Sequence, residues 1–124
     1  ACEAGELYRA ILENPYNPDM DNLEKIVNFY DYLEIQPTGN NEFMIRNGTV
    51  KDKEGLHDIV RKIIQLGEKC NKPIVATGDA HFLNPEDEVY RRILEAGQGY
   101  ADADTQAYQI NYQKISLKQL YIFI

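Results

Sequence analysis

The stretch from residue 30 to residue 77 constrains the fold of this chain most, because two strand-like runs in it flank a long amphipathic segment. Residues 30–36 have the composition of a strand, and Pro37 stops it. Residues 74–77 form an apolar, β-favouring run. A connection that contains a helix is long enough to cross over a sheet, so the two strands are expected to be parallel. The sequence therefore predicts an α/β fold, layered or a barrel, with parallel strands alternating with helices.

The amphipathic segment between these strands is the clearest helix in the sequence. It begins at Asp52 or Lys53 and carries an apolar stripe at helical spacing. The stripe consists of Leu56, Ile59, Val60, Ile63, Ile64 and Leu66. Asn71 is expected to end the helix in a left-handed conformation, and Pro73 keeps the helix from continuing.

Three further segments are predicted to be helical. The first covers residues 3–14, where the apolar spacing is formed by Leu7, Ala10 and Ile11. Asp19 or Asp21 is expected to cap the second helix, whose apolar face contains Leu23, Ile26, Val27 and Tyr30. Asn84 and the proline after it begin the last helix, which is expected to end at Gly97. Its buried face is expected to contain Val89, Ile93 and Leu94.

A tight turn is predicted at Asn47-Gly48, between short runs at residues 43–45 and 49–50. A small basic cluster lies beside this turn and consists of Arg46, Lys51 and Lys53. Such a cluster can meet a phosphate group, and the alternative interpretation is a solvated loop. The nine tyrosines follow no stacking pattern, so an aromatic platform for nucleic acid is not indicated.

Charge and composition exclude several classes of protein. The 124 residues, about one domain, include 13 Lys and Arg against 20 Asp and Glu, a net charge of −7. Such a surface repels nucleic-acid backbones, so stand-alone binding of nucleic acid is not expected. No apolar run approaches the roughly 20 residues that span a bilayer. The two cysteines form no disulfide framework, which favours the reducing cytoplasm. Because the chain starts without Met and inside a helical pattern, it is expected to be a piece of a longer protein.

The strongest candidate for chemistry follows the strand at residues 74–77. Side chains alternate along an extended backbone, so Asp79 and His81 are expected to point to the same side. A carboxylate and an imidazole at the carboxyl end of a strand make a ready pair of metal ligands. The alternative is a structural hydrogen bond between Asp79 and His81 that closes the strand. Two ligands do not complete a metal site, so further ligands must come from elsewhere.

Other polar residues are weaker candidates for ligands. A thiolate suits zinc-like metals, so Cys2 is a candidate, and a small buried hydrophobe is the alternative interpretation. Glu34 could face the same cavity, but such residues more often lie on a solvated face or support a neighbour by hydrogen bonds. His57 is expected on the polar surface of the long helix. Cys70, at the end of that helix, is expected to be structural.

Six short sequence motifs occur in a specific order. They are ACEAGEL at residues 1–7, FYDYLEIQP at 29–37, GNNEF at 39–43, IRNG at 45–48, ATGDAHF at 76–82 and AGQG at 96–99. Together they resemble the PolC-type DNA polymerase III α subunits of the Gram-positive type. The resemblance implies that residues 1–106 are the C-terminal part of a PHP (polymerase and histidinol phosphatase) domain. Residues 107–124 form a tail of uncertain structure, whose sequence departs from the family.

The resemblance also implies a fold and a metal site. The PHP domain is a distorted, TIM-like α/β barrel that holds metal ions at the carboxyl ends of its strands, so this chain is expected to form part of such a barrel. The last motif of the family supplies an Asp and a His as ligands, which match Asp79 and His81. A Cys-x-x-Gly-Glu motif supplies a third ligand, which matches Cys2. The implied metal is zinc or manganese, and the resemblance adds nothing to Glu34.

The family limits what this chain is expected to do alone. Its early motifs, including a His-x-His pair, are absent here, and multi-metal phosphoester chemistry needs two or three ions. No catalytic residue is therefore assigned, and the isolated chain is expected to be inert. In the parent, polymerisation uses Mg²⁺ in a separate domain, and a 3′–5′ exonuclease domain interrupts the PHP domain. DNA and deoxynucleotides are expected partners of the parent only.

The expected partner of this chain is the remainder of the polymerase chain. Exposed strand edges and an uncovered apolar face are expected to favour self-association of the piece by itself. One alternative is a free-standing PHP-type metal-dependent phosphoesterase whose site is completed by another chain, which a genuine start codon before residue 1 would favour. The other is a metal-free structural or interaction module, which would bind no divalent ion tightly.

Overall fold

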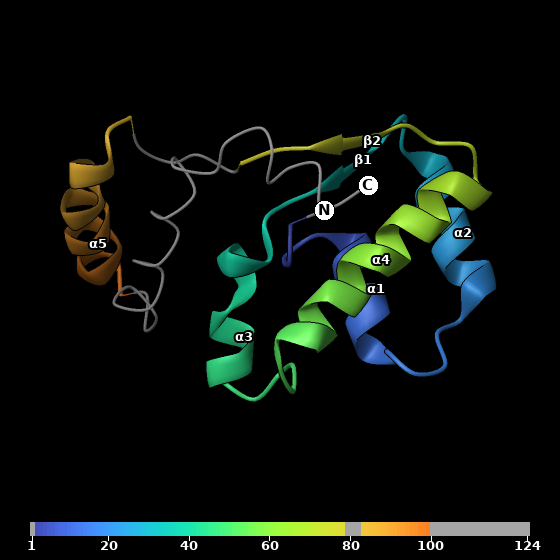
Figure 1. Cartoon of the computed structure of the whole chain (residues 1–124), viewed down its shortest axis with the longest axis horizontal. Coiled ribbons are helices and arrows are strands. Elements are labelled where there is room, and N and C mark those ends of the chain that lie inside the picture. Colours follow the sequence, from blue (N-terminus) through green and yellow to red (C-terminus); the bar gives the residue numbers. More distant parts are fainter. Residues whose placement is uncertain (1, 79–82, 100–124) are drawn as a thin grey trace. The chain divides into compact units, whose positions relative to one another are not determined.

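A computed structural model describes residues 2–78 and 83–99 of the chain. The chain divides into two units, Ala1–Thr77 and Gly78–Ile124, and each is described by itself. Figure 1 shows the helices and strands. In chain order the elements, with η marking a 3₁₀ helix, are α1 (Glu6–Glu13), α2 (Met20–Phe29), β1 (Leu33–Ile35), η1 (Thr38–Asn41), α3 (Phe43–Arg46), α4 (Lys53–Lys69), β2 (Ile74–Ala76), η2 (Pro85–Asp87) and α5 (Glu88–Gly97).

A parallel pair of strands organises the first unit. β1 and β2 pair with Leu33 opposite Ile74 and Ile35 opposite Ala76, so α4 is the crossover between them. This confirms the predicted α/β class and the parallel strands. Each strand is three residues long, shorter than the sequence predicts. The described residues form a two-stranded sheet, so the partial PHP-type barrel stays a prediction.

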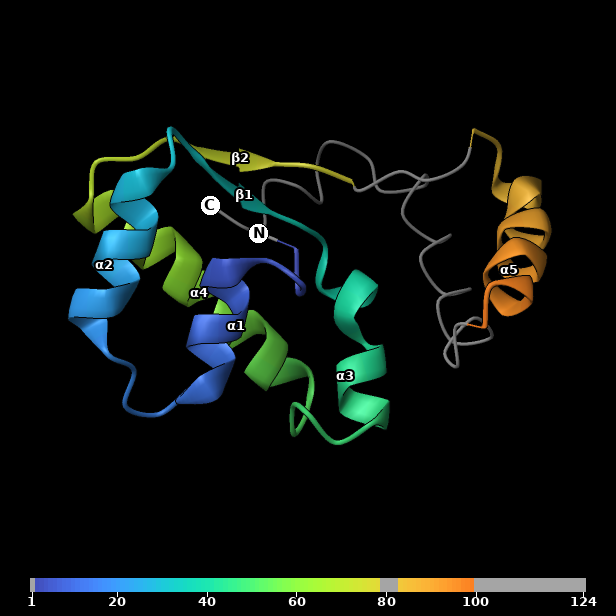
Figure 2. The same ribbon diagram turned by 180° about the vertical axis from the view of Figure 1, so that it is seen from behind.

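Helices α1, α2 and α4 pack together on one side of the sheet, as the views from both sides show (Figures 1 and 2). Helix α4 comes close to the strands at Gly67, where a Cβ atom would lie 2.7 Å from Cγ1 of Ile74 and 3.4 Å from Cδ1 of Leu33. The side chains buried most completely in this core are Tyr8, Ile11, Leu23, Val27, Leu56, Ile63 and Leu66. The apolar stripes predicted for the first three long helices therefore contribute to one core. The placement of Tyr30 on the apolar face of the second helix is wrong, because Tyr30 follows the end of α2 and is 38% exposed.

Helix boundaries agree with the capping residues in the sequence. Asp19 caps α2, because its Oδ1 accepts a hydrogen bond of 3.1 Å from the backbone N–H of Asn22. Asp52 caps α4 in the same way, accepting from the N–H of Gly55 at 3.0 Å. Beyond α4, Asn71 has a φ of 53°, the left-handed conformation that the sequence predicts. Asp19, not Asp21, is therefore the cap of α2, and Asp52 is the cap of α4, with Lys53 as the first helical residue.

The turn predicted at Asn47-Gly48 is present, and the run before it is helical. Gly48 has a φ of 79°, and Oδ1 of Asn47 accepts from the N–H of Thr49 at 3.0 Å. The residues before the turn form the short helix α3, in which Met44 is only 5% exposed. So short a run has only a weak conformational preference of its own, and the burial of Met44 accompanies its helical conformation.

In the second unit, α5 begins close to the predicted position, after one 3₁₀ turn. The carboxylate of Asp87 accepts from the backbone N–H of Asn84 at 3.1 Å, and α5 ends at Gly97 as predicted. Its predicted burial is wrong, since Val89, Ile93 and Leu94 are 48%, 62% and 65% exposed. Apolar periodicity shows which face of a helix can be buried, but it does not supply the surface that buries it.

Within the described residues, no helix is both long and apolar enough to cross a membrane.

Candidate metal centre

Of the three predicted ligands, the structure describes Cys2 alone. Asp79 and His81 lie outside the described residues, so their role as ligands stays a prediction. The alternative interpretation of Cys2 as a small buried hydrophobe is wrong, because its side chain is exposed and in no disulfide. The thiol donates to a carboxylate oxygen of Glu3 at 3.1 Å. An exposed sulfur is accessible to a metal ion in a way that a core cysteine is not.

The local structure explains the glycine of the Cys-x-x-Gly-Glu motif. The N–H of Gly5 donates to the carbonyl oxygen of Cys2 at 2.8 Å, which makes a tight turn directly before α1. A Cβ atom on residue 5 would lie 2.9 Å from that same oxygen, closer than real contacts allow. Glycine at this position therefore lets the chain place Cys2 one turn ahead of the helix.

Glu34 supports a neighbouring segment by a hydrogen bond, which was one of the roles expected for it. Its Oε1 accepts a hydrogen bond of 2.5 Å from Oγ1 of Thr77, just beyond the end of β2. Burial raises the pKa of Glu34, but the interactions of the carboxylate, foremost the bond from Thr77 and including one from Gln36, outweigh it and lower the pKa. The ionised form of Glu34 is thus favoured, and its carboxylate reaches from the middle of β1 to Thr77 beyond the end of β2.

Tyr8 and Asn41 form a buried polar contact that sequence reasoning missed. Nδ2 of Asn41 donates to the hydroxyl oxygen of Tyr8 at 3.1 Å, and the two residues are 3% and 2% exposed. Burial raises the pKa of Tyr8 to about 12, the bond from Asn41 opposes this, and the charges of Glu3 and Cys2 add to it. The segment with Cys2 therefore lies near the loop that follows β1. Neither residue was predicted from the sequence: Tyr8 is not among the apolar positions named for the first helix, and no local pattern indicates that Asn41 is its partner.

Buried amide side chains gather after β1. Gln36, Asn40 and Asn41 are 9%, 7% and 3% exposed. Both polar atoms of Asn40 and the side-chain oxygens of Gln36 and Asn41 have no hydrogen-bond partner in the described part of the chain. Buried polar atoms of this kind normally contact water or a ligand group. The carboxyl end of β1 is therefore polar as well as partly buried.

The donor types of the three predicted ligands fit zinc in kind. A thiolate, an imidazole and a carboxylate are all ligands that zinc accepts, and Cys2 presents the thiol at the surface. Among residues 2–78 and 83–99, no group of three or more His, Cys, Asp and Glu side chains is placed to hold a metal ion. Whether Asp79 and His81 complete a centre at Cys2 stays a prediction, because both lie outside the described residues.

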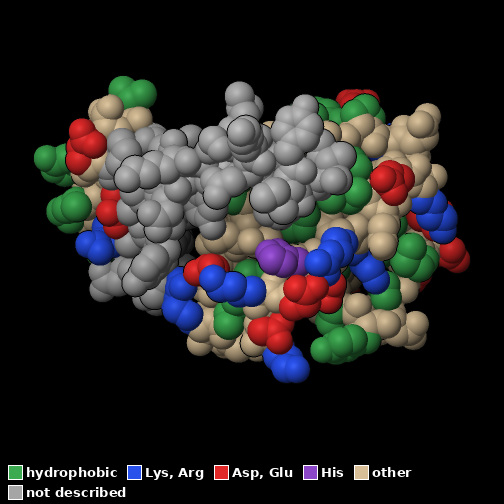
Figure 3. Space-filling model, viewed as in Figure 1, with side chains coloured by type: hydrophobic (Ala, Val, Ile, Leu, Met, Phe, Trp, Pro, Cys, Tyr) green, Lys and Arg blue, Asp and Glu red, His purple; other side chains and the backbone are tan. Residues whose placement is uncertain are grey.

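The weaker candidates have structural roles. His57 is a surface residue, as expected: its side chain is 41% exposed, and its Nδ1 lies 3.6 Å from a carboxylate oxygen of Glu54. Figure 3 shows acidic and basic side chains interspersed on one face of the molecule. Cys70 caps the end of α4. In the basic cluster, Nζ of Lys53 lies 2.9 Å from Oε1 of Glu42 and the cluster is exposed, which agrees with a solvated loop.

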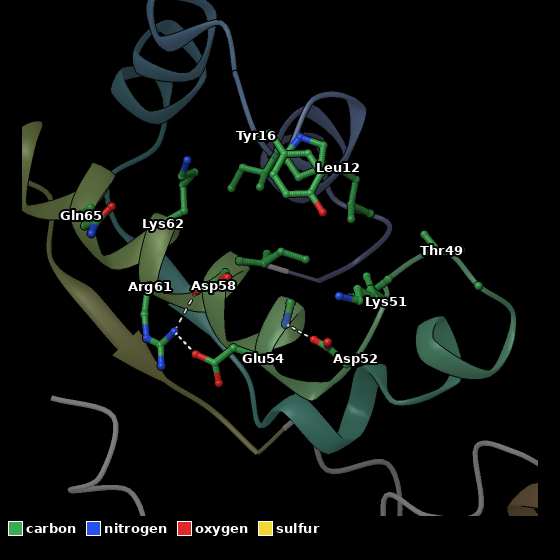
Figure 4. Close-up of a pocket in the computed structure, with 16 residues that line it drawn as sticks. Leu12, Tyr16, Thr49, Lys51, Asp52, Glu54, Asp58, Arg61, Lys62 and Gln65 are labelled. Atoms are coloured by element: carbon green, nitrogen blue, oxygen red, sulfur yellow. Dashed lines mark hydrogen bonds and ion pairs between the residues drawn. The ribbon is translucent and has the colours of Figure 1, made fainter.

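A pocket of about 840 Å³ lies elsewhere in the first unit, between α1, residues 48–52 and α4 (Figure 4). Its carboxylates Glu54 and Asp58 lie 2.6 Å and 2.8 Å from Nη1 of Arg61. The hydrogen bond from Arg61 lowers the pKa of Glu54. The pocket contains neither Cys2 nor Glu34, so it is separate from the candidate metal centre.

Comparison with known proteins finds relatives that share one name, PolC-type DNA polymerase III. The PolC-type DNA polymerase III of Clostridium perfringens is 59% identical over 106 residues, 86% of this chain. The protein of the same name from Caldanaerobacter subterraneus subsp. tengcongensis has the same identity over the same length, and that of Bacillus subtilis is 41% identical over 102 residues. The chain spans about 7% of the length of each of these relatives. No family model and no solved structure matches the chain.

Proposed function

Because the chain belongs to the PolC-type DNA polymerase III family, we propose that it forms part of a bacterial replicative DNA-directed DNA polymerase. One observation carries this proposal, the 59% identity over 106 residues to relatives that are all of this type. The matched part is 7% of their length. The polymerase activity itself is therefore assigned to residues outside this chain. The remainder of the polymerase would be the principal partner of this chain.

Within that polymerase, we propose that residues 1–106 are part of a metal-binding PHP domain and that residues 107–124 are a tail. Cys2, Asp79 and His81 would hold zinc or manganese. The bound ion would act as a Lewis acid that polarises a phosphoryl oxygen. The exposed thiol of Cys2 and the turn closed by Gly5 support this assignment. The ionised Glu34 adds negative charge at the strand ends, which favours a cation there.

The isolated chain is proposed to be inert. None of the described residues is assigned a catalytic role, and three ligands do not hold the two or three ions of phosphoester chemistry. The Mg²⁺ ions of polymerisation, the 3′–5′ exonuclease, DNA and deoxynucleotides all belong to the longer protein in this proposal. Its location is the cytoplasm, where replication enzymes and reduced cysteines are both found.

Elemental analysis of the purified chain tests the metal centre. The comparison is with the double variant Asp79→Ala/His81→Ala, carried through the same purification. About one equivalent of zinc or manganese in the native chain, lost in the variant, supports the centre. No metal in either sample would contradict the centre and leave the family assignment standing.

A phosphatase assay on the same two samples tests the proposed inertness. The native chain, supplied with zinc or manganese, is expected to hydrolyse a chromogenic phosphate ester no faster than the double variant. Hydrolysis by the native chain that the variant lacks would contradict inertness and favour a phosphoesterase.

A further inference from the structure

Helix α5 turns its apolar side to solvent. Val89, Tyr90, Ile93 and Leu94 recur at helical spacing, so they form one apolar stripe along the helix. They are 48%, 67%, 62% and 65% exposed. In Figure 3, which has the viewpoint of Figure 1, hydrophobic side chains lie at the surface over α5. Single exposed apolar residues are common, whereas a contiguous apolar surface marks a site of interaction.

The charged side of α5 is covered more than its apolar side. The side chains of Arg91 and Glu95 are 25% and 13% exposed and lie 2.6 Å apart. Those of Arg92 and Glu88 are 38% and 20% exposed, with 3.9 Å between Nη1 and Oε1. A helix that lacked contacts altogether would be exposed on every side, so α5 selectively presents its apolar stripe. Because both arginines are already paired within the helix, the stripe needs no counter-charge from the surface that it binds.

The length of the relatives indicates which partner covers the stripe. The match to the polymerase of Clostridium perfringens covers 106 residues of this chain and 7% of that protein. A matched stretch of this length within 124 residues includes α5 wherever it begins. In the proposed polymerase, most of the protein therefore lies outside these residues and is covalently joined to them. Its effective concentration at α5 is for this reason higher than that of a second copy of the chain.

We propose that the apolar stripe of α5 is a docking surface for the remainder of the polymerase chain. The complementary surface is an apolar groove that takes one side of the helix. The inference rests on the proposed membership of a longer polymerase, and it adds a surface through which the longer chain contacts these residues. A second copy of this chain is the alternative occupant, which the test distinguishes.

The test places a cysteine on each side of α5, both in the 124-residue chain and in the complete polymerase chain that contains it. Ile93→Cys and Leu94→Cys lie in the apolar stripe, and Arg92→Cys is the matched control on the charged side. Because Ile93 and Leu94 are exposed, these two changes are expected to leave the fold intact. The rate of reaction with a maleimide is measured by mass spectrometry of the peptide that contains α5, so the native cysteines do not contribute.

Both stripe cysteines are expected to react readily in the 124-residue chain. In the complete polymerase they should react about 10-fold more slowly or less, because a thiol within a buried contact reacts only when the contact opens. The control at Arg92 should react at nearly the same rate in both proteins. Equal rates of the stripe cysteines in the two proteins, or equal slowing at all three positions, would overturn the docking surface.

Two further measurements separate the alternatives. If the stripe cysteines react more slowly as the concentration of the 124-residue chain rises, yet react readily in the complete polymerase, a second copy is the occupant and the proposal is overturned. Primer extension by the unmodified complete protein checks the proposed function separately. Extension together with rapid labelling of the stripe contradicts this inference alone. Absence of extension contradicts the proposed function, and the inference falls with it.

Discussion

Gly67 determines how closely α4 approaches the sheet. A Cβ atom there would lie 2.7 Å and 2.8 Å from Cγ1 and Cδ1 of Ile74, so a side chain would push the helix away from β2. The same kind of constraint operates at Gly5, beside the carbonyl oxygen of Cys2. Single residues without side chains thus allow both the packing of the crossover and the turn that presents the candidate ligand.

Gly67→Ala is expected to destabilise the chain. Alanine gains up to about 1 kcal/mol in helix propensity, but overpacking costs about 1–3 kcal/mol, so the free energy of unfolding should fall by about 1 kcal/mol. Urea unfolding followed by circular dichroism measures it. Gly97→Ala is the matched control, since nothing lies within 4 Å of its Cβ position. Stabilisation by Gly67→Ala would show that Ile74 moves aside without cost.

Tyr8 is expected to make stability depend on pH in alkaline solution. Its folded pKa of about 12 lies above the usual value of 10.0, so the folded state keeps the proton that the unfolded state loses between these values. Stability is therefore complete below pH 10 and falls as pH rises toward 12, by about 1.4 kcal/mol per pH unit from this group. Urea midpoints of the native chain should fall more steeply over this window than those of Tyr8→Phe. Parallel curves would contradict the assignment.

Among the elements, α4 shows that a cap and surface ion pairs contribute unequally to the stability of a helix. Asp52 accepts from the N–H of Gly55, a bond that the first turn of a helix otherwise lacks. Arg61 pairs with Glu54 and Asp58, but all three side chains are more than half exposed, at 54%, 64% and 68%. Water and salt screen such pairs, so the cap is the stronger contribution.

Asp52→Ala is expected to lower the free energy of unfolding by about 1 kcal/mol, and Arg61→Gln by about 0.5 kcal/mol or less. Both changes are in or next to the same helix, so thermal or urea unfolding compares them directly. Raising the salt concentration should remove the small effect of Arg61→Gln and leave that of Asp52→Ala. An Arg61→Gln effect larger than the Asp52→Ala effect would contradict this ranking.

At the scale of the whole molecule, α5 differs from the helices of the first unit. Its charged residues pair along the helix, with Arg91 2.6 Å from Glu95 and Arg92 3.9 Å from Glu88. Its apolar side chains, by contrast, are largely exposed. An amphipathic helix with an uncovered face is a surface for association. The remainder of the polymerase chain and a second copy of this chain are the proposed candidates to cover it.

Ile93→Glu is expected to leave the stability of the chain nearly unchanged, within about 0.5 kcal/mol, because Ile93 is 62% exposed. Self-association, measured by sedimentation velocity at several concentrations, is expected to decrease. Ile63→Ala is the control from the core, where a side chain 1% exposed should cost about 2–5 kcal/mol. A loss of more than about 2 kcal/mol in Ile93→Glu would mean that α5 is buried within the chain.

Local features and the family could be predicted without the structure. Asp19, Asp52 and Asn71 act within a few residues of themselves, so their roles at helix ends could be predicted from the sequence. The length of the crossover predicted parallel strands, and the resemblance of six short motifs predicted the PolC family.

Contacts between residues far apart in the sequence could not be predicted and are seen only in the fold. The contacts of Glu34 with Thr77 and of Tyr8 with Asn41 join residues 43 and 33 positions apart. The helix at residues 43–46 and the exposure of α5 were also decided there. Local patterns identify a side chain that can be buried or bonded, but the partner comes from the packing of separate elements, which single-sequence periodicity does not encode.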